Sequence, residues 1–459
     1  MRTGSEDHFQ HLNERPVDDV SLDFFYKPHT LTALAAVVVF LVYTALTNDD
    51  SNRDENIWTA LKVILLFFMI ISCLAFPNGP FTRPHPALWR MAFGLTVFYL
   101  FCLLFVLFQN FDDVKAMLRW LDPAKLNKEE LDEKEYAVNC SNVTLGRLWE
   151  GMDIFAVAHF LGWAMKALLL RHGLLCWYIS ISWEVTELAF SHLLPNFQEC
   201  WWDAILLDVL LCNGLGIWFG MWVCRKLEMR SYHWESIKNI KGTRGKIKRA
   251  VLQFTPATFT KFKWLDPEST FMRTVAVAII VIIWQICELN TFFLKHIFAV
   301  ATEHPINTYR ILLIGIITAP ALRQYYGYVT DPKCPRIGTQ CWVYVTVVLT
   351  EAIVCIKFGS EIFKQTQLLN IGVWILFLFL GSILTVYLSV VWAQGASYTR
   401  EMHYNGAVLH RYVDSSTAHR RDSLKAIDLR VAQKDHRPTE VIFASETPLR
   451  RLFLFGCVL

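Results

Sequence analysis

Five carboxylates fall within 25 consecutive residues of a largely apolar stretch: Glu184, Glu187, Glu199, Asp203 and Asp208. An ionised carboxylate at the centre of a bilayer costs at least about 2–3 kcal/mol. Too few Lys and Arg side chains lie nearby to neutralise five of them. A divalent cation is the most economical partner, although the same residues could instead hold helices together.

The spacing of these carboxylates fits a cation site. Glu184 and Glu187 are three residues apart and share a helix face. Glu199 and Asp203 are four apart and would share a face if the next helix begins early enough. Asp208 would lie about 140° further round an α-helix and so could serve a second position.

Two amides accompany the acids, Asn196 in the predicted turn and Asn213 in the following span. A ligand set made of carboxylates and Asn196 contains only oxygen, which favours Ca²⁺ or Mg²⁺ over zinc. The many donors and the irregular spacing favour Ca²⁺.

One histidine, His159, lies in the preceding apolar run together with Lys166. A histidine beside a metal and carboxylates can accept a proton near neutral pH. The alternative is a packed histidine that donates to a backbone carbonyl.

The composition indicates which elements position these groups. The chain has 459 residues, of which 54% are hydrophobic and only 19% are charged. Globular chains carry about a quarter charged residues, so the deficit excludes a disordered chain, a coiled coil and most soluble enzymes. The net charge of +3 gives no argument for nucleic acid. The 12 cysteines show no zinc-ligand spacing.

Apolar runs of spanning length predict an all-α, polytopic membrane protein with about ten transmembrane helices. The runs are 30–47, 58–76, 89–108, 152–170, 174–194, 202–224, 272–294, 309–322, 341–357 and 371–393. A multi-span membrane domain over 30–393 therefore follows a polar segment, 1–29, and precedes a basic tail, 394–459.

The distribution of Lys and Arg predicts the orientation. The connections rich in these residues include 225–249 and 323–336, whereas 48–57 and 195–201 are poor in them. Both termini are therefore expected in the cytosol, with the acidic cluster toward the lumen. The 109–151 loop carries glycosylation triplets at Asn139 and Asn142, which fit the lumenal side. Its segment 113–121 predicts a short interfacial amphipathic helix.

Two further groups of charges have two readings each. Arg83 lies in a Pro-rich cytosolic turn, 78–86, that is either a rigid turn or, with Arg249 and Arg323, an anion pocket. Glu288, near the end of its span, forms either an intramembrane ion pair or an exposed helix end.

Four motifs resemble the eukaryotic base-exchange phosphatidylserine synthases, and the similarity runs from about residue 23 to 393. They are LAFPNGPFTRPHPALWR at 74–90, GWAMKAL at 162–168, HLLPNFQECWWD at 192–203 and GKIKRAVLQFTP at 245–256. The type-1 enzyme is the most similar. The pattern typical of CDP-alcohol phosphotransferases is absent from the sequence, which argues against a CDP-diacylglycerol donor.

The resemblance implies a calcium-dependent enzyme of the endoplasmic-reticulum membrane. It would replace the choline or ethanolamine of phosphatidylcholine or phosphatidylethanolamine with L-serine, and its product, phosphatidylserine, would restrain it. The resemblance also implies the roles of four sets of residues. His159 is the catalytic residue; Glu187, Asn196, Glu199 and Asp203 are the metal ligands; Glu184, Asp208 and Asn213 bind substrate. Arg83, His85, Arg249, Gln253, Pro256 and Arg323 are the regulatory residues.

His159 would act as a general base or as a covalent nucleophile. A homodimer is possible, since symmetric dimers are common. Two other classes remain in view. A transporter with a Ca²⁺-binding acidic pathway would spread its carboxylates over several helices. A membrane-bound O-acyltransferase uses an intramembrane histidine but needs no acidic cluster.

Overall fold

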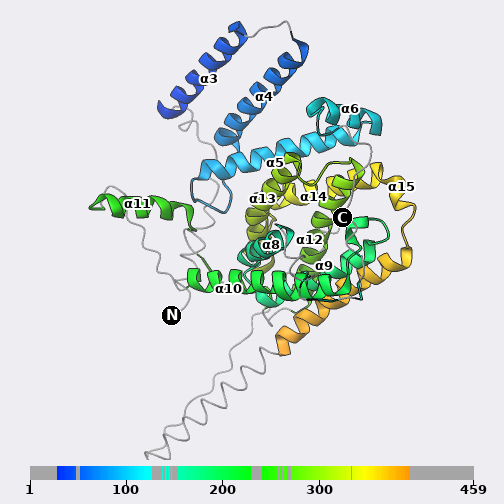
Figure 1. The fold of residues 1–459 in the computed structure, drawn as a ribbon. Helices are drawn as coiled ribbons and strands as arrows, with labels where there is room; N and C mark the ends of the chain where they lie inside the picture. The colour runs from blue at the N-terminus through cyan, green and yellow to red at the C-terminus, as the bar shows by residue number, and fades with distance from the viewer. Residues whose placement is uncertain are drawn as a thin grey trace, which may run out of the picture. The chain divides into compact units, whose positions relative to one another are not determined.

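The computed structural model describes residues 28–47, 52–126, 137, 140–141, 143–144, 146, 154–228, 240–256, 259–260, 262–265, 270–331 and 333–391. Every regular element in these residues is a helix (Figure 1). The all-α class is thereby confirmed. The predicted terminal segments, 1–29 and 394–459, lie almost wholly outside the described residues, as do Asn139 and Asn142.

The helices follow one another in chain order. They are α3 (Pro28–Thr47), α4 (Arg53–Ala75), α5 (Pro86–Leu107), α6 (Phe111–Leu121), α8 (Ile154–Leu170), α9 (Gly173–Phe190), η1 (Pro195–Phe197), η2 (Asp203–Asn213), α10 (Gly214–Glu228), α11 (Thr243–Val251), η4 (Leu252–Phe254), α12 (Thr270–Ile297), α13 (Pro305–Thr330), α14 (Thr339–Phe358) and α15 (Ser360–Phe363). A final apolar helix covers Leu368–Val391.

Seven helices of the described chain are long and apolar enough to cross a membrane. They are Arg53–Ala75, Pro86–Leu107, Asp203–Glu228, Met272–Ile297, Pro305–Thr330, Thr339–Phe358 and Leu368–Val391. The other three predicted spans coincide with α3, α8 and α9, so each predicted run is helical, while the count of ten stays a prediction. The run 309–322 underestimates α13, because Pro305 and His304 start that helix earlier.

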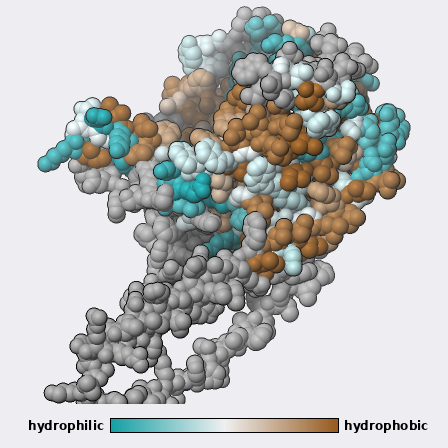
Figure 2. Space-filling model, turned by 60° about the horizontal axis from the view of Figure 1, so that its bottom comes forward, coloured by the Kyte–Doolittle hydropathy of each residue, from teal (hydrophilic) through white to brown (hydrophobic). Residues whose placement is uncertain are grey.

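Contacts divide the chain into two units, one of 1–264 with 277–382 and the other of 265–276 with 383–459. The first contains every site residue. The described part of the second consists of Leu265, the first turns of α12 and the end of the final helix. Apolar side chains cover much of the face in Figure 2, as a lipid-facing surface requires.

Two glycines let α10 approach α8 closely. A Cβ at Gly216 would lie 2.5 Å from the carbonyl oxygen of Phe160, and one at Gly220 would lie 2.6 Å from that of Ala164. Small residues four apart allow such contact between membrane helices. The pair therefore fixes α8 against α10, which directly follows the helical segment that carries Asp203 and Asp208.

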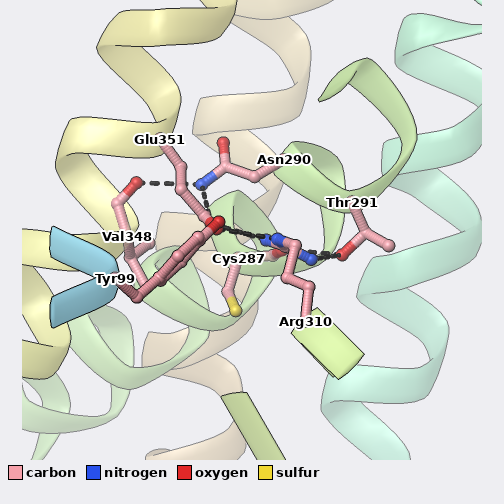
Figure 3. A network of polar contacts seen from close by, with 7 residues as sticks. All are labelled: Tyr99, Cys287, Asn290, Thr291, Arg310, Val348 and Glu351. Carbon is pink, nitrogen blue, oxygen red and sulfur yellow. Dashed lines mark hydrogen bonds and ion pairs between the residues drawn. The ribbon is translucent and has the colours of Figure 1, made fainter. Parts of the chain in front are cut away.

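A buried ion pair joins α5, α12, α13 and α14 (Figure 3). Glu351 is fully buried and accepts two bonds from Arg310, at 2.7 Å from Nε and 2.5 Å from Nη2. Tyr99 donates to the same carboxylate at 2.5 Å, and the amide of Asn290 lies 3.3 Å from it. Arg310 also donates to Thr291 Oγ1 at 2.6 Å. Every polar atom of the carboxylate is therefore satisfied by protein.

A disulfide links Cys140, in the segment before α8, to Cys200, between η1 and η2. Cys200 is buried with Trp202 and Leu207, and Cys140 packs on them. The bond therefore ties the two ends of the α8–α9 hairpin together.

We expect Arg310→Met to destabilise the protein by about 3–5 kcal/mol, because it leaves the buried Glu351 charge without its partner. Adding Glu351→Gln should recover most of this loss, since Gln removes the unpaired charge and its amide oxygen can still accept the bond from Tyr99. Thermal melting in detergent, followed by size-exclusion chromatography, measures both effects.

Lys364→Met is the control for the Arg310 and Glu351 variants. It breaks the exposed ion pair between Lys364 and Glu361 and should barely change the melting temperature. If Arg310→Met with Glu351→Gln is as unstable as Arg310→Met alone, then pairing of the two charges is not what stabilises this part of the bundle.

Cys140→Ser and Cys200→Ser should lower stability by a similar amount, and the double variant should lose no more than either single one. The bond spans 60 residues, and closing such a loop contributes about 4 kcal/mol by the chain-entropy estimate. Melting of the three variants forms a double-mutant cycle. Additive losses would mean that the cysteines act separately.

Candidate active site

The predicted acidic span contains a π-helix, η2, over Asp203–Asn213. Hydrogen bonds in a π-helix join residues five apart. Asp203, Asp208 and Asn213 are spaced by five, so this geometry brings them toward one side of the helix. The expected angle of about 140° between Asp203 and Asp208 assumed α-helical turns, and it is wrong because the turns here are wider.

The π-helix meets both helices of the preceding hairpin. His159 Nδ1, from α8, lies 3.5 Å from Asp208 Oδ1. The side chain of Asn213 is fully buried and donates to Ser180 Oγ of α9 at 3.0 Å. The structure therefore places His159 beside Asp208 of the acidic cluster.

Glu184 is the least satisfied acid of this cluster. Both of its carboxylate oxygens are buried and have no hydrogen-bond partner among the described residues. Asp208, Glu199 and Asp203 all lie within electrostatic reach of it. A bound cation is the kind of partner that would stabilise such a carboxylate in its ionised form.

Glu187 belongs to the same cluster, because Glu184, Glu199 and Asp208 are within electrostatic reach of it. The five predicted carboxylates thus come together from α9, η2 and the segment between them. Within the described residues, no three His, Cys, Asp or Glu side chains converge tightly enough to form a ready-made metal cage.

The helix that contains η2 begins at Trp201, and Glu199 lies two residues before it. The helical face expected to join Glu199 with Asp203 is therefore not formed. Burial, with the nearby charges of Asp208 and Asp203, raises the pKa of Glu199 to about 8. Its neighbour Cys200 carries the disulfide, which fixes this segment, and Asn196 lies one turn earlier in η1.

Lys166 and Glu288 form an intramembrane ion pair, with Nζ 2.7 Å from Oε1. Of the two readings left open for Glu288, the ion pair is confirmed. Lys166 is within electrostatic reach of Glu184, and Glu288 is within reach of Glu187. The pair therefore borders the acidic cluster.

Part of the predicted regulatory set meets at the Pro-rich turn. Arg249 donates to Gln253 Oε1 at 2.9 Å, and Gln253 donates to the carbonyl of Pro84 at 2.7 Å. Arg83 precedes that proline, and His85 caps α5 through the backbone N–H of Ala87.

The other two members of the set are Arg323 and Pro256. Arg323, on α13, lies against the rings of Phe262 and Tyr326. Pro256 is exposed.

The sequence analysis missed the disulfide partners Cys140 and Cys200. A signal existed, because the predicted orientation puts both cysteines on one side with two spans between them. It also missed the partnership of Arg310 with Glu351, although both are charges inside predicted apolar runs.

Comparison with known proteins identifies the family. A family model described as "Phosphatidyl serine synthase" matches residues 84–359. The chain is 55% identical over 384 residues to "Phosphatidylserine synthase" of Drosophila melanogaster, covering 83% of this chain and 77% of the relative. It is 55% identical over 388 residues to "Phosphatidylserine synthase 1" of Danio rerio, covering 84% and 83%.

A more distant relative carries a different name. "CDP-diacylglycerol--serine O-phosphatidyltransferase 1" of Arabidopsis thaliana is 37% identical over 352 residues, covering 74% of this chain and 82% of the relative. The residues that the family model matches, 84–359, contain the α8–α9 hairpin and η2. The chain belongs to the phosphatidylserine synthase family and is similar to its type-1 members.

Proposed function

We propose that this protein makes phosphatidylserine by calcium-dependent exchange, replacing the choline or ethanolamine of a phospholipid with L-serine. The observation that carries the proposal is the buried Glu184 carboxylate, which has no hydrogen-bond partner among the described residues. It lies within electrostatic reach of Asp208, and Asp208 lies beside His159. The names of the relatives support serine as the headgroup that is added.

The donor set fits a hard divalent cation. Glu187, Asn196, Glu199 and Asp203 would hold Ca²⁺, because all four offer oxygen ligands. The raised pKa of Glu199 supports this assignment, since a carboxyl group that resists ionisation alone is one that a cation would stabilise as the anion. When bound, the ion supplies charge neutralisation at the oxygens of the phosphodiester.

His159 is proposed as the general base. Its Nδ1 faces Asp208, which would orient the ring and leave Nε2 for the substrate. Nε2 takes the proton of the serine hydroxyl as its oxygen bonds to phosphorus. The bond from phosphorus to the choline or ethanolamine oxygen breaks, and the imidazolium returns the proton to that oxygen. One ester replaces another, so no activated donor is consumed.

Glu184 and Asn213 complete the proposed substrate-binding set. The Glu184 carboxylate would attract the ammonium of serine or of the departing base. Asn213 would act through its position, since its side chain is fixed on Ser180.

The orientation is part of the proposal. Disulfides persist on the oxidising side of a membrane, so the Cys140–Cys200 bond supports a lumenal position for the cluster and cytosolic termini. The endoplasmic reticulum follows from the family resemblance alone, and the homodimer rests only on the general frequency of symmetric dimers.

A second donor deserves testing because of the plant relative. Its name specifies CDP-diacylglycerol, whereas this sequence lacks the motif typical of CDP-alcohol phosphotransferases. Exchange is favoured on that ground, and the same assay separates the two routes.

The test is incorporation of labelled L-serine by purified protein into phosphatidylcholine or phosphatidylethanolamine micelles, with Ca²⁺ or with chelator. We expect calcium-dependent incorporation that falls by about 10²–10⁴-fold in His159→Ala, the range for loss of a general base. His192→Ala, a histidine at the end of the same hairpin, is the matched control.

Incorporation only when CDP-diacylglycerol is supplied would establish the second donor. No incorporation from any lipid by folded protein would contradict a synthase and favour the transporter.

Feedback inhibition of the enzyme by its product, phosphatidylserine, is expected to depend on the contacts around the Pro-rich turn. Arg249→Ala removes the bond to Gln253, and so it should weaken inhibition by added phosphatidylserine while basal activity stays within about twofold. Arg83→Ala should behave in the same way. Arg244→Ala, on the same exposed helix, is the control, and full inhibition in both Arg83→Ala and Arg249→Ala would exclude this role.

A further inference from the structure

Lys166 lies on the same helix as His159, seven residues further on. Seven residues are close to two α-helical turns, so both side chains leave α8 on nearly the same side, about 10 Å apart along the axis. Lys166 thus belongs to the face of α8 that meets the acidic cluster. Its side chain is 16% exposed and that of Glu288 is 24% exposed, so both remain accessible.

The ammonium of Lys166 is held in place from two sides. Glu288 Oε1 lies 2.7 Å from Nζ, and the indole of Trp284 donates to the same oxygen at 2.5 Å. The ring of Trp163 lies beneath the ammonium, 4.0 Å from its centre to Nζ. A lysine fixed in this way cannot be treated as a solvated side chain.

Helix packing does not require this charge. Well-packed apolar residues replace a buried ion pair at little or no cost. An ammonium also has three donors, and Glu288 engages only one of them. The remaining donors can bind a second anionic group without breaking the pair.

The acceptor substrate supplies such a group. L-Serine differs from ethanolamine by a carboxylate, and this carboxylate would be repelled by Glu184, Glu187 and their neighbours. A fixed cation at the border of the cluster offsets that repulsion and recognises the one feature by which the two acceptors differ.

We infer that Lys166, held by Glu288 and Trp163, binds the carboxylate of the incoming serine and so selects serine over ethanolamine. This inference rests on the proposed exchange reaction. In this arrangement the bound cation would contact the phosphodiester, and Lys166 would contact the carboxylate of serine.

The experiment compares labelled L-serine with labelled ethanolamine as acceptors into phosphatidylcholine micelles. For Lys166→Met we expect KM for serine to rise by about tenfold or more, the scale of one lost charge-assisted hydrogen bond, with KM for ethanolamine within about twofold. Lys166→Arg keeps the charge and should retain part of the preference. Glu288→Gln keeps the bond to Trp284 and the lysine charge, so it should retain most of it.

An equal loss with both acceptors would overturn the inference, since a structural role or a contact with the phosphodiester affects both alike. An unchanged ratio would also overturn it. If Lys166→Met does not fold, the Lys166→Gln and Lys166→Arg variants give the same comparison.

Calorimetric binding of free L-serine to the wild type and to the Lys166 variants separates the two proposals. Serine binding that Lys166→Met abolishes supports the inference even if the donor is not phosphatidylcholine. Binding that persists unchanged overturns it while leaving the exchange reaction intact.

Discussion

A carboxylate inside a membrane must find a partner, because no water is available there to solvate it. The helical bundle meets this constraint in two ways. Glu351 accepts hydrogen bonds from Arg310 and Tyr99 and contacts Asn290, so groups of the protein itself stabilise its negative charge. Glu184 has no such partner among the described residues. The first arrangement holds helices together, and the second leaves a charge that a ligand can complete.

The geometry that gathers the unsatisfied charges depends on irregular backbone. In an α-helix, Asp203 and Asp208 would diverge, whereas the wider turns of η2 bring them toward one side. Gly216 and Gly220 let α10 approach α8, which holds His159 next to Asp208. The arrangement of the site therefore depends both on the π-helix η2 and on the close packing of α10 against α8.

Much of this arrangement could be predicted from the sequence. Hydropathy located every helix of spanning length, and the density of carboxylates between 184 and 208 indicated the site, because charge is so costly in an apolar run. The π-helix could not be predicted, since periodicity arguments assume 3.6 residues per turn. Nor could the partners of Arg310 and Lys166, which come from helices distant in sequence. Pairing of such residues depends on how helices pack, which hydropathy does not encode.

The disulfide between Cys140 and Cys200 closes the α8–α9 hairpin into a covalent ring. Both helices coincide with predicted membrane spans, and on that prediction an even number of membrane crossings separates the two ends of the ring. It can close only after both helices have been inserted and the chain has returned to the side on which it started. A chain that inserts α9 wrongly leaves the two thiols on opposite faces of the bilayer. On the predicted topology, formation of this one bond would therefore distinguish the molecules in which the segment carrying Glu184 and Glu199 was inserted correctly during biosynthesis.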